Sequence, residues 1–162
     1  MAAGVSMSKE KLGILTELLN GSENLNDEML VRKVWIDVAL PFEYITESFI
    51  EQLGLLEPFG MANERPVFAE KCTGIERIRI LGKNRNVIIL HVKNKSNFPM
   101  EAVCFEEDTS FLGYLTEKFG AEEVNALIQG KKNNMFLNIV YYPELNEYNG
   151  YRNIRFVIKR YS

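Results

Sequence analysis

Few side chains in this sequence are spaced as a catalytic centre would require. The one histidine, His91, lies inside an expected strand without a Cys, Asp or Glu at metal-ligand spacing, so we expect a structural or surface role for it. The densest carboxylate cluster, residues 106–108, consists of three successive acids. Adjacent residues rarely point at one cation, so a solvated loop and helix start is the simpler interpretation. Because the phosphate-binding patterns GxxxxGK[ST] and GxGxxG are also absent, we expect neither catalytic residues nor a metal site in this chain.

Side chains that could bind a polyanion are better represented. Cations alternate with apolar residues in two expected strands, and burial of the apolar set would leave the cations on the outer face. The candidate nucleic-acid contacts are Arg77 and Arg79 in one strand, Lys83 and Arg85 in the turn after it, Tyr148 and Tyr151 around the last loop, and Arg155 and Lys159 in the last strand. Any solvated sheet face also shows alternating charges, so the sequence pattern leaves both interpretations open.

These candidates belong to a part of the chain whose pattern is mainly β. Alternation and turn residues predict strands over residues 75–81, 87–93, 100–105, 135–142 and 153–161, and a helical segment over 111–128 that is broken near Gly120. Residues 82–86 are expected to form a turn and residues 143–150 a loop. The predicted fold class is therefore mainly β with α (α+β): a five-stranded OB-type Greek-key barrel with its helix between strands three and four. Other small barrels fit the same order.

In an OB barrel, the loops between strands one and two and between strands four and five border the usual oligonucleotide groove. Cations there follow phosphates and aromatic rings stack on bases. If the four strand cations share the outer face of adjacent strands, the eight candidates form one basic track that ends in stacking groups.

The first part of the chain is expected to be a helical connector. A helix follows Ser8 and ends near Gly21, residues 33–40 alternate like a strand, and Thr46 caps a second helix. Residues 1–65 contain five Lys and Arg against eleven Asp and Glu, whereas residues 66–162 contain fourteen against eleven. We therefore divide the chain into a connector, residues 1–65, and a barrel domain, residues 66–162.

The compartment is predicted from what the sequence lacks. Cys72 and Cys104 lie far apart without CxxC spacing, as expected for reduced thiols. No apolar run approaches the ~20 residues that span a bilayer, and no signal-peptide pattern is present. We expect a cytoplasmic protein without a membrane partner.

The stretch LEPFGMANERPVF, residues 56–68, resembles the LEPFGxGNPxPxF signature of the RecJ family, the single-stranded-DNA-specific exonucleases of bacteria. Ala62 stands where that family usually has Gly, and Glu64 where it usually has Pro. Two further segments agree: residues 146–159 are similar to the family's closing turn and last strand, and residues 1–7 to the end of its GGHxxAAG motif. The resemblance covers essentially the whole chain.

The resemblance implies a C-terminal fragment, with the end of the DHH-associated domain, a connector and an OB domain. The parent would be a 5'-to-3' exonuclease of DNA repair and recombination, whose catalytic core, with Mg or Mn as its cofactor, precedes this chain. The implied partners are single-stranded DNA and the upstream catalytic domains, with other repair proteins unidentified. An architectural or protein-docking barrel without DNA contact is the alternative.

The signature stretch itself is expected to fix the connector helix to the barrel at a set angle. Pro58 and Pro66 restrict the backbone and Gly60 permits a tight bend. Contact of Asn63 and Arg65 with DNA is a secondary expectation.

Overall fold

The computed structural model describes residues 4–21, 33–148 and 150–162, and the chain divides into two compact units, Met1–Val34 and Trp35–Ser162. In the first unit, a 3-10 turn η1 (Lys9–Lys11) leads into helix α1 (Leu12–Asn20). This confirms the predicted helix and its end before Gly21, although the side chain of Ser8 makes no capping hydrogen bond. No side chain of α1 is buried among the residues that the structure describes.

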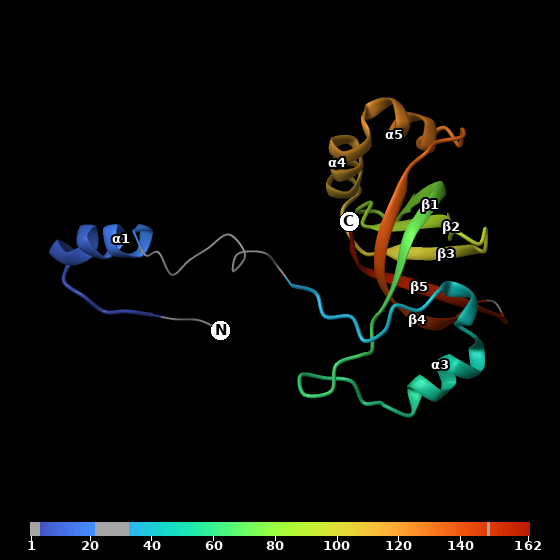
Figure 1. The fold of residues 1–162 in the computed structure, drawn as a ribbon, viewed down its shortest axis with the longest axis horizontal. Coiled ribbons are helices and arrows are strands. Elements are labelled where there is room, and N and C mark those ends of the chain that lie inside the picture. Colours follow the sequence, from blue (N-terminus) through green and yellow to red (C-terminus); the bar gives the residue numbers. More distant parts are fainter. Residues whose placement is uncertain (1–3, 22–32, 149) are drawn as a thin grey trace. The chain divides into compact units, whose positions relative to one another are not determined.

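The second unit is built on a closed barrel (Figure 1). Its strands are β1 (Phe68–Leu81), β2 (Val87–Lys93), β3 (Pro99–Cys104), β4 (Phe136–Tyr148) and β5 (Tyr151–Tyr161). They pair in the order β1-β2-β3-β5-β4, with β3 and β5 parallel and every other pair antiparallel. Helices α4 (Asp108–Phe119) and α5 (Ala121–Ile128) connect β3 to β4. The predicted Greek-key barrel, with its helical segment between the third and fourth strands, is confirmed.

The barrel core consists of the apolar side chains that alternate with outward-facing residues along the strands. Every second residue is buried inside, as with Ile88, Leu90 and Val92 on β2. Helices α4 and α5 lie at one end of the barrel, and helix α3 (Glu47–Gly54) lies at the other (Figure 1). Gly120, with φ of 89°, ends α4 and lets the chain turn into α5, which explains the predicted break.

The strand predicted over residues 33–40 is wrong. Only one isolated parallel bridge, Val38 to Phe68, forms there, and Val38 is 51% exposed. The reason is the closure of the barrel: β1 pairs with β4 from Phe68 and with β2 from Gly74, so it offers a free edge for only a few residues. The free edge is therefore too short for residues 33–40 to add a strand beyond the bridge at Val38.

The loop predicted over residues 143–150 is mostly strand. β4 continues through Pro143 to Tyr148 and pairs with β5 as far as Tyr148 and Tyr151. Beyond Tyr141, β4 no longer pairs with β1 and has one free edge. A proline, which lacks an N–H donor, is tolerated at such an edge. The two last strands thus form a long hairpin that extends past the barrel.

The connector segments before the barrel are fixed by specific hydrogen bonds. Thr46 Oγ1 accepts a hydrogen bond from Phe49 N at 3.1 Å, which confirms the predicted cap of α3. The Asn63 side-chain amide donates to the carbonyls of Leu56 at 2.7 Å and Pro58 at 3.1 Å. Asn63 therefore closes the signature stretch into a compact loop, and its amide is engaged within the protein.

The short 3-10 helix η2 (Phe42–Tyr44) places an aromatic ring inside the barrel. Phe42 is fully buried, with its ring centroid 4.6 Å from that of Phe156 and 5.2 Å from that of Tyr141. The Tyr141 hydroxyl donates to the Leu40 carbonyl at 2.8 Å. Residues 40–45 thus belong to the same compact unit as the barrel, and the division of the chain at residue 65 stays a prediction.

Glu70 should give the barrel a measurable pH dependence. Its carboxylate accepts a hydrogen bond from Phe42 N at 2.9 Å. Burial raises the pKa of Glu70, and the charge of Glu43 raises it further, while the bond from Phe42, the Asn94 amide and Lys95 oppose the rise. A carboxyl whose pKa is raised on folding binds its proton more tightly when folded. Its contribution to stability is therefore greatest below the ordinary pKa of about 4.5 and falls as pH rises through the folded-state pKa.

We expect Glu70→Gln, which keeps the acceptor oxygen for Phe42, to be more stable than the parent at pH 7 and to lose that advantage toward pH 4. Urea unfolding of both proteins across this range measures the difference. An advantage that is independent of pH would contradict the assignment.

Candidate nucleic-acid interface

Strand register lines up one row of side chains across the outside of the barrel. The row runs Arg79, Ile89, Val103, Val157, Tyr142 over strands β1, β2, β3, β5 and β4. Its neighbours along each strand, such as Ile88 and Phe156, point into the core, so this row faces outward. Although they face outward, Val103 and Val157 are only 1% and 3% exposed. The accessible groups of the row are therefore at its ends: Arg79 and Ile89 on one side and Tyr142 on the other.

A second row beside it is charged. Arg77 lies opposite His91, and His91 lies opposite Glu101 on β3. Further along the barrel order, Arg155 on β5, the strand next to β3, lies opposite Glu144 on β4. We call these two rows together the outer face.

Two of the four predicted strand cations are ion-paired on this face. Arg79 lies 3.6 Å from the Glu101 carboxylate. Arg155 donates to Glu144 Oε1 from Nε at 2.8 Å, and both side chains are about three-quarters buried. Among the described residues, Arg77 has no carboxylate partner, and Lys159 lies over an aromatic ring instead. The outer face is thus less positive than its cations alone suggest.

The strand cations do not occupy adjacent strands, and that expectation is wrong. In the closed barrel, β2 and β3 lie between β1 and β5 in one direction around the barrel, and β4 lies between them in the other direction. Three strand spacings, or about 14 Å, separate β1 from β5 across β2 and β3, and two spacings, or about 10 Å, separate them across β4. The cations therefore flank the outer face at its two margins instead of forming one continuous track.

The predicted loop residues differ in role. Arg85, in the β1–β2 turn with φ of 52°, pairs with Asp108 at 2.6 Å, while its carbonyl accepts the Asp108 N–H at 3.0 Å. It ties the turn to the start of α4. Lys83 is exposed in the same turn. Tyr151 is 81% exposed at the hairpin end, and the side chain of Tyr148 lies outside the part that the structure describes.

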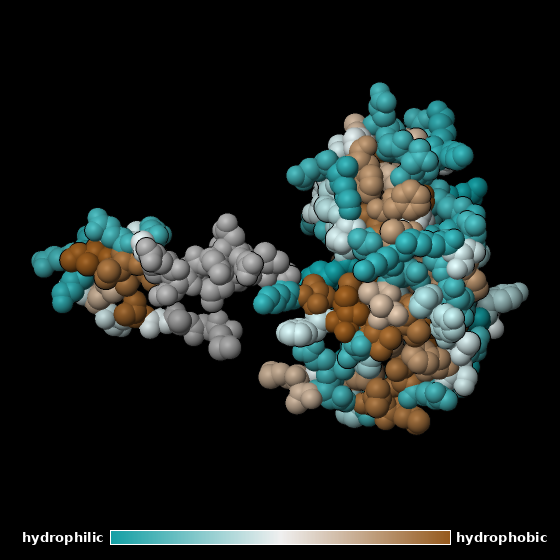
Figure 2. Space-filling view, viewed as in Figure 1, coloured by the Kyte–Doolittle hydropathy of each residue, from teal (hydrophilic) through white to brown (hydrophobic). Residues whose placement is uncertain are grey.

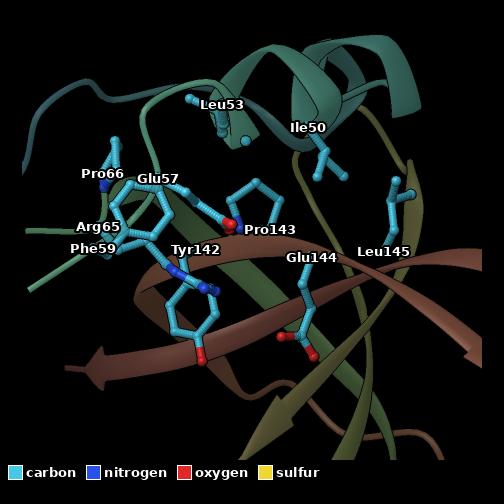
Figure 3. A pocket seen from close by; sticks show the side chains of 11 residues that line it. Ile50, Leu53, Glu57, Phe59, Arg65, Pro66, Tyr142, Pro143, Glu144 and Leu145 are labelled. Carbon is cyan, nitrogen blue, oxygen red and sulfur yellow. The ribbon is translucent and has the colours of Figure 1, made fainter.

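Tyr142 and Arg65 form a feature that the sequence patterns do not predict. The Arg65 guanidinium lies 4.6 Å from the centroid of the Tyr142 ring and 5.1 Å from that of Phe59, and Lys159 Nζ lies 5.6 Å from the Tyr142 centroid (Figure 3). Burial raises the pKa of the Tyr142 phenol, so it stays neutral. Nothing in the sequence places residue 65 beside residue 142, since the contact depends on how the connector returns to the barrel.

Tyr142 also lines a pocket of about 240 Å³ between α3, the signature stretch and β4. Figure 3 shows Ile50 and Leu53 of α3 above it and Pro143 and Leu145 of β4 below. Glu57 and Glu144 are its carboxylates and Arg65 its cation. With two acids at its wall, the pocket is poorly suited to a phosphate, but its rim at Arg65 and Tyr142 joins the outer face.

No catalytic arrangement is found in the described residues. They contain no group of three His, Cys, Asp or Glu side chains that could hold a metal ion. Cys104 is buried and its pKa is raised to about 12, mainly by burial, which makes its thiol unreactive. In the same residues, no helix has both the length and the apolar character to cross a bilayer.

The strand order, the closed barrel and the helices between the third and fourth strands define an OB fold. The family model described as RecJ OB domain matches residues 36–160. The chain therefore belongs to the RecJ OB domain family.

Known relatives agree with this assignment. The chain is 28% identical over 99 residues to the single-stranded-DNA-specific exonuclease RecJ of Bacillus subtilis (strain 168), a match that covers 60% of this chain and 13% of that protein. It is similar in fold to crystal structures of RecJ from Thermus thermophilus in complex with Mg²⁺ and Mn²⁺. The TM-scores are 0.53 and 0.54 at 17% identity, over 81% and 82% of this chain and 17% and 16% of those chains. The match thus spans only a small part of each relative.

Proposed function

We propose that this chain is the single-stranded-DNA-binding domain of a RecJ-like 5'-to-3' exonuclease that acts in DNA repair and recombination. The RecJ relative in Bacillus subtilis is described as specific for single-stranded DNA, and this chain matches 13% of it. Phosphodiester hydrolysis, with magnesium or manganese as the expected cofactor, belongs in this proposal to other domains of the parent protein. The barrel's role is to hold the strand.

The observation that supports this proposal best is the Tyr142 end of the outer face. Single-stranded nucleic acid is held without sequence preference where cations follow the backbone and aromatic rings stack on bases. Tyr142 offers a neutral ring with two cations, Arg65 at 4.6 Å and Lys159 at 5.6 Å from its centroid. Ile89 and Arg79 form the other accessible end of the same row, on β2 and β1.

An architectural or protein-docking barrel is the second candidate. Apolar side chains are exposed on the connector: Trp35 is 86% exposed and Leu55 84%, and Met61 is fully exposed. In Figure 2, brown apolar side chains gather on the lower part of the barrel unit, while α4 and α5 above are mostly hydrophilic. Such a surface would suit another domain or a repair protein better than a polyanion.

Salt dependence separates the two candidates. Phosphate contacts release counterions, so affinity for DNA falls steeply with added salt, whereas apolar docking does not. Fluorescence anisotropy with labelled single-stranded and duplex DNA at two salt concentrations measures this. We expect salt-sensitive binding that favours the single strand, and equal affinity for both forms would contradict the proposal.

Arg79→Ala and Lys159→Ala test the margins of the outer face in the same assay. Each should weaken binding of every DNA sequence similarly. Each should also lower the salt slope, which is the steepness with which the logarithm of the binding constant falls against the logarithm of the salt concentration, by about 0.7 for each phosphate that the variant no longer binds. Lys71→Ala removes an exposed lysine of β1 that belongs to neither row of this face, and it is the matched control. If the two margin variants bind as the control does, the outer face is only solvated and the architectural candidate is preferred.

A further inference from the structure

A second basic surface lies where β1 and β2 meet the loop after α5. It is an open cleft of about 620 Å³, lined by Ile75, Glu76, Arg77, His91 and residues 130–133. Two of the latter, Lys131 and Lys132, are not among the contacts that the sequence predicts. We call this surface the basic cleft.

The loop that carries the two lysines is fixed by its own hydrogen bonds. Gly130, with φ of 67°, ends α5 in a Schellman motif: Lys131 N donates to Ala126 O at 2.8 Å and Gly130 N to Leu127 O at 2.9 Å. Further along, the Glu123 carboxylate accepts a hydrogen bond from Asn134 N at 2.9 Å. The lysine backbone is therefore held in place before any ligand arrives, which lowers the entropy cost of binding.

The cleft has a surplus of unpaired positive charge. Its one carboxylate, Glu76, is already paired with Lys93. In the described part of the chain, no carboxylate pairs with Arg77, Lys131 or Lys132, in contrast to Arg79 and Arg155 on the outer face. An anion that entered the cleft would therefore not have to displace an existing ion pair.

The cleft also continues the outer face. Arg77 and His91 lie opposite each other in the second row of that face, and both line the cleft. A strand that crosses the barrel from Tyr142 toward β1 reaches the cleft next. We propose that the basic cleft binds backbone phosphates of single-stranded DNA beyond the outer face, and so lengthens the bound segment. This inference rests on the proposed function.

The competing explanation is that Lys131 and Lys132 only complement the negative end of the α5 dipole. That role would affect folding and not DNA. Because both side chains are exposed, the double variant Lys131→Ala/Lys132→Ala should fold as the parent does.

The test is anisotropy of the 162-residue chain with a labelled oligothymidylate of about 16 nucleotides, near the upper end of the site size of one OB fold, from 50 to 200 mM salt. If each lysine binds one phosphate, the double variant should lower the salt slope by about 1.4, so the affinity gap to the parent narrows about sevenfold over that range. The double variant Lys71→Ala/Lys95→Ala removes the same charge from exposed positions outside the cleft and should keep the parent slope.

The possible outcomes are distinct. If the parent binds DNA and the cleft variant, Lys131→Ala/Lys132→Ala, has the same salt slope as the parent, the cleft inference fails while the proposed function stands. The same conclusion holds if both double variants lower the salt slope equally. If the parent does not bind, the proposed function fails. A polyglutamate peptide that binds the parent as tightly as the oligonucleotide does, and fails to bind the cleft variant, would assign the cleft to an acidic protein segment instead.

Discussion

Phe42→Ala should lower the free energy of unfolding of the barrel unit by about 3 to 5 kcal/mol, the range for removing a buried phenylalanine ring. Phe42 is fully buried against Tyr141 and Phe156, although it lies before β1 in the chain. Its loss would leave a cavity between the connector and the barrel. Urea unfolding followed by circular dichroism measures the change.

Tyr44→Ala is the matched control for this variant. Tyr44 lies in the same 3-10 helix but is 65% exposed, so its removal should change stability by no more than about 0.5 kcal/mol. Equal effects of the two variants would mean that η2 packs loosely on the barrel. If only Phe42→Ala lowers the free energy of unfolding, the barrel needs residues before the signature stretch for its full stability.

Tyr142→Ala should weaken binding of single-stranded DNA by about 1 to 3 kcal/mol, or roughly 5-fold to 150-fold, if its ring stacks on a base. The salt slope should hardly change, since no phosphate contact is removed. Tyr142→Phe keeps the ring and should bind nearly as the parent does. Anisotropy titrations at two salt concentrations measure both quantities.

The stacking assignment fails if Tyr142→Phe loses as much affinity as Tyr142→Ala, because the hydroxyl would then be the contact. It also fails if Tyr142→Ala binds like the parent. Because Tyr142 lines the pocket beneath α3, thermal unfolding of each variant should accompany the titrations. A charge variant such as Lys159→Ala should show the opposite pattern, with a smaller slope.

The alternation of β2 and the cap of α3 were predictable because they are local. Apolar residues at every second position predict one buried face, and β2 runs over Val87–Lys93 as expected. Thr46 caps α3 through a bond to a residue three positions later. The same rules failed for residues 33–40, since alternation indicates a strand only where a sheet edge is free to accept it.

The candidate contacts were only partly predictable. Alternation correctly places Arg77 and Arg79 on the outside of β1, where both are exposed. It does not reveal that Glu101 pairs with Arg79 or that Glu144 pairs with Arg155, because partners on neighbouring strands depend on register. Whether these residues bind DNA stays a prediction.

The sequence by itself therefore determined the order of the five barrel strands and of the helices between them and, through the signature stretch, the family and with it the OB type among small barrels. Each depends on patterns within a few residues or on a motif read along the chain. Tertiary structure alone decided that β1 and β5 are separated, that Arg65 reaches Tyr142 and that Lys131 and Lys132 adjoin Arg77. These relations join residues far apart in sequence, and barrel closure and strand register, which no local pattern encodes, bring them together.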